Sequence, residues 1–154
     1  MKELSEYRVS LVNKLVAVAN EFATACLAAK DEFSPLTEDG WNIHQLAVHV
    51  RDVNHLVYGE RARRTAVEED PEFQDFDGET YMAEHYSADE PLSNIAADLR
   101  GQIDALAGML RTLPPDAWSR TSRHAKLGHG FTLQSWVERD LAHIEEHLQT
   151  VRGH

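Results

Sequence analysis

The sequence predicts an all-α protein folded as a four-helix bundle. Four stretches repeat apolar residues at steps of three and four, the pattern of helices with one buried face. No stretch shows the strict alternation of apolar and polar residues that is typical of strands. One long polar connection separates the second and third stretches, as in bundles with a crossover. At 154 residues, the chain is expected to form a single domain, residues 1–154, with a core of its own.

The first two helices are expected over residues 3–30 and 42–64. The apolar strip of the first helix ends at Cys26, the only cysteine of the chain, which excludes an intrachain disulfide. Its neighbours are small and apolar, so a buried residue is favoured over a reactive thiol. Asn42 and Gln45 form the N-x-x-Q pattern of a capping box at the start of the second helix.

An acidic stretch, residues 67–90, is expected to be the crossover, with one short helix over residues 79–85. An extended chain covers about 3.3 Å per residue, so this stretch is long enough to cross the whole bundle. Helices two and three would then run parallel, which gives an up-down-down-up order. The third helix is expected over residues 92–113, because Pro114 and Pro115 stop it.

A second connection is expected over residues 115–130, with Trp118 as an anchor and Gly128 and Gly130 as hinges. Structureless loops of this length are often functional. Thr132 is placed to cap the fourth helix, which continues almost to the C-terminus.

The fourth helix carries two histidines, His143 and His147, that are four residues apart. Residues at this spacing lie one turn apart on the same face of a helix, so the two imidazoles can hold one small divalent ion. The chain has nine histidines, and a chance pair of surface imidazoles is the alternative interpretation. A third ligand on another helix would favour the metal site.

His49 on the second helix is the candidate for this third ligand. Apolar neighbours such as Leu46 and Val50 place it toward the bundle interior, whereas His44 and His55 point to other sectors and are expected at the surface. Facing helices lie about 8–10 Å apart, within reach of imidazoles that share one ion. Three neutral nitrogens and one open position are typical of a catalytic metal site. The alternative is a histidine at the edge of the core that binds a backbone carbonyl.

Three carboxylates, Asp52, Asp140 and Glu146, are candidates to accept a hydrogen bond from the second ring nitrogen of a ligand histidine. Asp52 lies one helical turn from His49, and Asp140 lies one turn from His143. The alternative is that each carboxylate faces solvent.

The composition excludes several classes of partner. The formal net charge of −11 argues against nucleic acid, since proteins that bind it carry clustered Lys and Arg. It also argues against an anionic membrane surface. No apolar run is long enough to span a membrane, and the N-terminus is too polar for a signal peptide. A cytoplasmic protein is therefore expected.

Several segments, taken together, resemble the DinB-like family. Residues 41–52, WNIHQLAVHVRD, resemble the W-x-x-x-E-x-x-x-H-L-x-D segment that opens the second helix of this family. Residues 70–77, DPEFQDFD, resemble its acidic aromatic crossover. Residues 130–136 and 143–147 resemble the start and the metal-binding face of its fourth helix. The resemblance covers about residues 5–150.

The resemblance implies an up-down-down-up bundle, often a homodimer, that holds a divalent metal on three histidines. Matched residue by residue, these are His49, His143 and His147, and zinc or nickel is the expected ion. Gln45 stands where the family often has Glu, which affects a capping position rather than a ligand. The superfamily includes transferases and isomerases that use low-molecular-weight thiols such as bacillithiol or mycothiol, whose pKa a bound metal lowers.

The leading hypothesis is therefore a metal-dependent enzyme that acts on a small molecule, either a thiol S-transferase or a related hydrolase. The alternative is a non-catalytic, stress-associated binding or dimerisation bundle with a vestigial metal site. An enzyme needs a pocket at the open coordination position, and the two long connections are the expected walls. They carry five aromatic residues that either line this pocket or cover the core: Phe73, Phe76, Tyr81, Tyr86 and Trp118.

Overall fold

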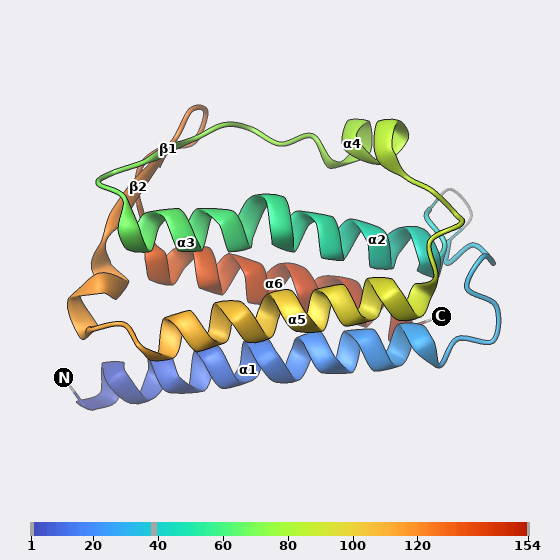
Figure 1. Ribbon diagram of the computed structural model, residues 1–154, viewed down its shortest axis with the longest axis horizontal. Helices are drawn as coiled ribbons and strands as arrows, with labels where there is room; N and C mark the ends of the chain where they lie inside the picture. The colour runs from blue at the N-terminus through green and yellow to red at the C-terminus, as the bar shows by residue number, and fades with distance from the viewer. Residues whose placement is uncertain (1, 38–39, 154) are drawn as a thin grey trace.

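Four long helical segments lie side by side in the computed structural model, which describes residues 2–37 and 40–153 (Figure 1). The first and third are α1 (Lys2–Leu27) and α5 (Leu92–Arg111), and the last is α6 (Leu133–Arg152). The second is one continuous rod made of α2 (Ile43–Val53), the π-helix η1 (Asn54–Tyr58) and α3 (Gly59–Val67). The four-helix bundle expected from the apolar periodicity is confirmed.

The apolar strips of these segments meet in one core. The α2–α3 rod contributes smaller apolar side chains, such as Val50. The largest fully buried apolar side chains come from α1, α5 and α6, and burial of each stabilises the fold by about 1.5–3 kcal/mol: Leu15, Phe22, Val12, Ile95, Leu99, Ile103, Leu106, Leu110, Leu133, Trp136 and Ile144. Cys26 is 1% exposed, as expected of a small buried residue. None of the helices in the described ranges is both long enough and apolar enough to cross a membrane.

The predicted helix caps at Asn42 and Thr132 are confirmed. The Asn42 side chain accepts a hydrogen bond from the Gln45 backbone N–H at 2.8 Å, and the Gln45 side chain accepts one from the Asn42 N–H at 2.9 Å. Thr132 Oγ1 accepts a hydrogen bond from the Ser135 N–H at 3.1 Å. These caps satisfy backbone donors at the starts of α2 and α6, the two helices that carry the candidate ligands.

The crossover runs along the outer side of the α2–α3 rod, from its end back to its start (Figure 1). It contains α4 (Gly78–His85), which matches the short helix expected there. As a result, α5 runs in the same direction as α2–α3: Arg51 binds Asp98 at 3.2 Å, and Asn54 lies 2.9 Å from Gln102 further along both helices.

A small sheet corrects the expectation that the chain has no strands. It consists of β1 (Glu72–Phe73), β2 (Thr121–His124) and β3 (Gly128–Thr132) in the order β1-β2-β3. β1 pairs parallel to β2, and β2 pairs antiparallel to β3. Strands of two to five residues are too short to show alternation, and β1 lies in a different connection from its partner. The sheet therefore left no signal in the sequence.

The second connection is ordered by its contacts with the bundle. Its 3₁₀-helix η2 (Pro115–Ser119) buries Trp118, which is 5% exposed, as expected of an anchor. Gly128 and Gly130, expected as hinges of a loop, instead lie in β3 with φ of 99° and 82°. These values favour glycine, so the two residues shape the β2–β3 hairpin.

The π-turn η1 is the main departure of the helical rod from the expected regular helix. The Gly59 N–H donates to the Asn54 carbonyl, five residues earlier. A Cβ on Gly59 would lie 2.5 Å from the Asn54 carbonyl oxygen, so only glycine fits without a backbone shift. The extra residue changes the face on which all later side chains of the rod lie.

His44, expected at the surface, is fully buried, with an exposed fraction of 0%. Its Nε2–H donates to the Glu90 carbonyl at 2.7 Å, and the Tyr86 hydroxyl donates to its Nδ1 at 2.6 Å. The end of the crossover covers the helix sector that holds His44, which local sequence does not reveal. His55 is exposed, as expected.

Candidate metal centre

Three imidazoles, those of His49, His143 and His147, converge between α2 and α6. The Nε2 of His143 lies 3.2 Å from the Nε2 of His49 and 3.1 Å from the Nε2 of His147. All three nitrogens lie within 4.8 Å of one another. The structure thus brings together the three residues that the sequence singled out, and they are called the histidine cluster below.

The spacing of these nitrogens fits one small divalent ion. Two ligands at about 2.0–2.1 Å from a zinc ion are about 3.3 Å apart in tetrahedral geometry, close to the observed 3.1 and 3.2 Å. A ring nitrogen carries either one hydrogen or one lone pair, so the Nε2 of His143 cannot satisfy two neighbours by hydrogen bonding alone. An ion that accepts three lone pairs satisfies all three nitrogens. The donor set therefore fits a metal.

Burial keeps these imidazoles neutral. It lowers the pKa of His49 to about 4, and the neighbouring His147 lowers that pKa further. Burial and the two other imidazoles lower the pKa of His143 to about 3. Burial also lowers the pKa of His147, against the opposing charge of Glu146. At neutral pH, a metal would not have to displace protons from these nitrogens.

The three carboxylates proposed to orient the histidines lie elsewhere than expected. Asp52 accepts a hydrogen bond from Arg51 Nε at 2.9 Å, and Glu146 is exposed. The Nδ1 of His143 is buried without a hydrogen-bond partner in the described part of the chain, so Asp140 does not bind it there. None of the three carboxylates forms a hydrogen bond with a cluster imidazole among the described residues.

Asp140 is instead part of a buried polar chain between three helices. It is 0% exposed, and this burial raises the pKa of its carboxyl to about 8. With its amide nitrogen turned toward Asp140, Asn54 of the π-turn donates to both carboxylate oxygens, at 3.1 and 2.6 Å. The other end of the Asn54 amide meets Gln102 of α5 at 2.9 Å. This chain holds α6 against η1 next to the histidine cluster.

The crossover and the loop before α2 fix the ring of His49 from outside the bundle. The Trp41 ring lies 4.8 Å from the His49 ring, between centroids. A Cβ on Gly78 would lie 3.2 Å from the Cε1 of His49, closer than ordinary contact. Glycine at position 78 thus lets the crossover pass close over the imidazole.

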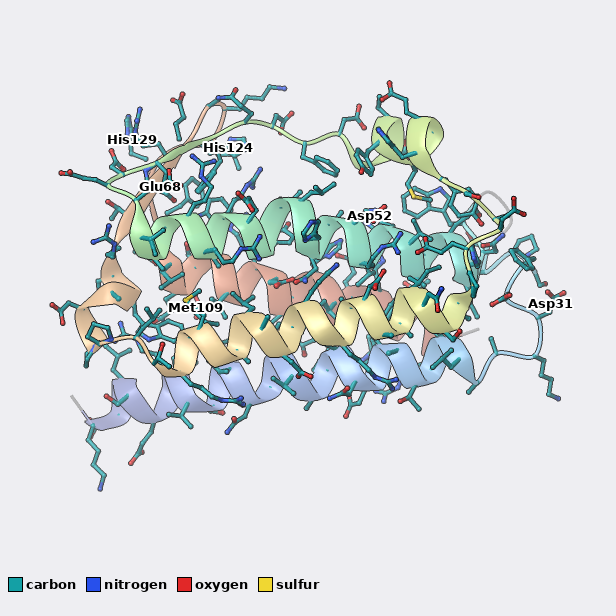
Figure 2. The ribbon with its side chains drawn as sticks, in the orientation of Figure 1. Asp31, Asp52, Glu68, Met109, His124 and His129 are labelled. Atoms are coloured by element: carbon teal, nitrogen blue, oxygen red, sulfur yellow. The ribbon has the colours of Figure 1, made fainter. Side chains whose placement is uncertain are left out.

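A cavity of about 280 Å³ adjoins the histidine cluster, and His49 and His143 form part of its wall. Val53, Val57, Tyr58 and Arg61 of the α2–α3 rod and Arg139 of α6 line its sides. Five residues of the two connections line its outer side: Asp75, Phe76, Gly78, His124 and Leu127. In Figure 2, His124 lies between α3 and the crossover. The expectation that the connections supply walls is therefore met.

The five aromatic residues of the connections divide between the two roles left open. Phe76 lines the cavity. Phe73 and Trp118 are buried in the core, at 4% and 5% exposure. Tyr86 binds His44, and Tyr81 stacks on His85 with ring centroids 4.0 Å apart. Most of these aromatics thus cover or brace the fold instead of forming the cavity.

The sequence did not single out Tyr58, Arg61, His124 or Arg139, which the fold places in the cavity wall. For Arg139 the sequence spacing could have indicated this position, because it is four residues before His143 and the two share a face of α6. For Arg61 the spacing gave no such indication, since a regular helix would turn it about 120° away from His49. The extra residue of the π-turn reduces that offset to about 20°.

Comparisons with known proteins agree with this architecture. The chain is similar to YfiT from Bacillus subtilis, described as "a probable metal-dependent hydrolase with an unusual four-helix bundle topology". The two structures match with a TM-score of 0.86 at 21% sequence identity, over 96% of this chain and 85% of that one. At this identity the match shows a common fold. A search of curated proteins found no significant match.

The family is shown by a match to the sequence itself. The family model described as the DinB superfamily matches residues 6–151. The match spans all four helical segments and all three cluster histidines. The chain belongs to the DinB superfamily.

Proposed function

We propose that this protein is a metal-dependent enzyme whose histidine cluster holds one divalent ion, zinc or nickel, and acts on a small molecule. The observation that carries the proposal is the position of the cluster: its three Nε2 atoms converge, and two of its residues, His49 and His143, line a cavity. A purely structural site would be closed by a fourth protein ligand. The described residues offer three, which leaves a position for water or substrate.

The residues around this site orient the cluster imidazoles and keep them able to bind an ion. Trp41 and Gly78 fix the ring of His49, and burial keeps the imidazoles neutral and able to coordinate. When bound, a divalent ion supplies Lewis acidity that lowers the pKa of a coordinated water or thiol. Phe76 and Leu127 supply apolar surface to the cavity wall.

Within this class we propose a thiol S-transferase that uses a low-molecular-weight thiol, or a related hydrolase. The resemblance to DinB-like thiol-dependent enzymes supports the transferase, and the description of YfiT as a probable metal-dependent hydrolase supports the hydrolase. An open cavity beside the cluster suits both, because each needs room for a nucleophile and an electrophile. A non-catalytic bundle with a vestigial site is the alternative function.

Two finer expectations from the sequence stay proposals. The up-down-down-up order is supported by the parallel contacts of the α2–α3 rod with α5, through Arg51 and Asp98. A homodimer rests on the resemblance alone. A monomeric mass by light scattering across micromolar concentrations would contradict the dimer.

The experiment that tests the function compares the wild type with His143→Ala, purified without an affinity tag. Zinc affinity should fall at least about 10³-fold, since one of three ligands is lost. Thiol-dependent transfer to a panel of electrophiles, and hydrolysis without thiol, should both disappear. The helical circular-dichroism signal should stay, because apolar packing holds the bundle.

His129→Ala is the matched control, because His129 is an exposed histidine on β3, away from the cavity wall (Figure 2). It should keep zinc binding and activity within about twofold. Full activity of metal-free His143→Ala would overturn the mechanism. Zinc binding by the wild type, without activity toward any electrophile of the panel, would favour the vestigial site.

A further inference from the structure

The cavity beside the histidine cluster carries positive charge in a chain whose net charge is −11. Arg61 of α3 and Arg139 of α6, called the arginine pair below, both line it. Within residues 2–37 and 40–153, neither guanidinium has a carboxylate within 4.0 Å. Asp75, the acidic group of the cavity wall, is bound by Lys126 at 2.8 Å.

Arg61 is held as a fixed donor and is not a mobile surface cation. Its side chain is buried, with the whole residue 8% exposed. Its Nη2 donates to the Gln74 carbonyl at 2.9 Å, and its guanidinium lies 4.8 Å from the centre of the Trp136 ring. Burial lowers the pKa of Arg61, as expected of a cation without an adjacent anion, yet arginine stays charged at neutral pH.

Arg139 approaches the same aromatic platform from α6. Its guanidinium lies 5.1 Å from the centre of the Phe131 ring and 5.8 Å from that of Trp136. Phe131 stacks on Trp136 with ring centroids 4.9 Å apart. The two cations thus flank one aromatic stack, which offsets part of the repulsion between them by cation–π attraction.

His124 adds a neutral donor to the same cavity. Its Nδ1 accepts hydrogen bonds from the backbone N–H groups of Lys126 and Leu127, each at 3.1 Å. The ring hydrogen must therefore be on Nε2, which is 3.9 Å from Asp75, beyond hydrogen-bond distance. His124 lines the cavity, and its Nε2–H has no hydrogen-bond partner among the described residues, so this donor is free to bind a ligand.

The π-turn places Arg61 on nearly the same face of the α2–α3 rod as the metal ligand His49. It brings Arg61 back to within about 20° of the helix face that holds His49. On α6, Arg139 lies one turn before His143 on the same face. Because α6 runs antiparallel to the α2–α3 rod, Arg61 and Arg139 lie at one end of the cavity wall and the histidine cluster lies at the other.

We propose that the arginine pair and His124 bind the oxyanion group, carboxylate or phosphate, of a small substrate. Guanidinium forks bind such groups bidentately, and a cavity of about 280 Å³ admits only a small molecule. The opposite end of the substrate then lies at the histidine cluster. This last point rests on the proposed function, whereas anion binding does not.

The test measures binding to the full chain after a chelator has removed metal. Succinate and inorganic phosphate are the anionic probes, and succinamide is the neutral probe of similar shape; isothermal titration calorimetry gives each dissociation constant. At least one anion should bind tenfold or more tightly than succinamide, and the preferred one identifies the group. Equal binding of all three probes would overturn the inference.

Three variants locate the site. Arg61→Gln and Arg139→Gln should each weaken the preferred anion tenfold or more. Arg63→Gln is the matched control, because Arg63 is two residues from Arg61, binds Glu60 at 2.8 Å and does not line the cavity; it should change binding less than twofold. An equal loss in Arg63→Gln would show general charge attraction and contradict the site. If Arg61→Gln fails to fold, anion binding by Arg139→Gln decides the result, because Arg139 is exposed and its replacement should not disturb the fold.

A separate zinc titration distinguishes this inference from the proposed function. Zinc affinity should be the same within threefold in Arg139→Gln and the wild type, because Arg139 is not a ligand. Anion binding that depends on Arg139, in a chain without measurable zinc affinity, would support the anion site and refute the metal-dependent function. Normal zinc affinity without anion preference would refute the anion site alone.

Discussion

The helix pair α1–α5 and the pair formed by the α2–α3 rod and α6 bury very different side chains. In the first pair the buried residues are aliphatic, aromatic or small, apart from Arg8 near the N-terminus. Polar contacts there lie at exposed positions, such as the bonds from Arg100 to Asn20 and Thr24. The second pair holds the half-buried histidine cluster and also buries five polar side chains: His44, Asn54, Arg61, Thr65 and Asp140.

This difference separates stability from chemistry within one core. Burial of a polar or charged group costs free energy unless partners compensate, so the second pair is stabilised less by its own packing. The first pair supplies aliphatic burial that offsets this cost. A bundle can therefore hold three neutral imidazoles and an arginine in its interior without a disulfide, since Cys26 is the only cysteine.

The largest effect on stability is expected from truncation of a buried side chain in the α1–α5 pair. Leu99 is 1% exposed, and Leu99→Ala removes buried methyl groups and leaves a cavity. The free energy of unfolding should fall by about 2–5 kcal/mol, measured by urea denaturation. Zinc affinity should stay within threefold of the wild type, because α5 contributes no ligand. A loss of zinc binding in the folded variant would show that the two helix pairs are not separable.

The next effect concerns the second helix pair and is expected from acid. The pKa of His49 is lowered to about 4 and that of His143 to about 3, from 6.5. Between these values and pH 6.5 the unfolded chain binds more protons than the folded one, so stability falls as the pH falls. Metal-free protein should lose a few kcal/mol of stability between pH 6.5 and 4 through these two groups, measured by urea denaturation.

The double variant His49→Gln/His143→Gln isolates that effect. Asp140, whose raised pKa makes stability fall as the pH rises from about 4 to about 8, is common to both proteins. The free energy of unfolding of the wild type minus that of the double variant should therefore decrease steadily from pH 7 to pH 4. Parallel pH profiles would mean that burial does not keep the imidazoles neutral.

The smallest effect is expected where the sheet meets the second helix pair. The Trp136 Nε1–H donates to the Ser122 hydroxyl at 2.7 Å, and this hydroxyl donates to the Phe131 carbonyl at 2.8 Å. Ser122→Ala leaves the buried indole N–H unpaired and should lower the free energy of unfolding by about 1–2 kcal/mol. The exposed Ser119 gives the control, Ser119→Ala, with a change below about 0.5 kcal/mol. Equal stability of both variants would mean that this bond does not hold the hairpin.

Several local features could be read directly from the sequence. The caps at Asn42 and Thr132 depend on residues three positions apart, so composition and spacing suffice to predict them. The shared face of His143 and His147 follows from the helical repeat alone. The bundle itself follows from four apolar strips that have no partner other than one another.

Other features depended on contacts between distant segments. His44 is buried because Tyr86 and Glu90, more than forty residues later, close over it. β1 and β2 lie about fifty residues apart in the chain and are too short to be recognised separately. The π-turn was also hidden, because Gly59 in a helical pattern is compatible with a regular helix as well.

The sequence by itself determined the fold class, the helix starts and the three histidines, because each depends on a periodicity of a few residues within one helix. Only the tertiary structure decided what surrounds those histidines. The cavity wall combines residues from the rod, the crossover, the hairpin and α6, and their meeting depends on the one-residue shift of the π-turn and on the path of the crossover. Such contacts arise from packing between segments far apart in the chain, which periodicity within one segment does not encode.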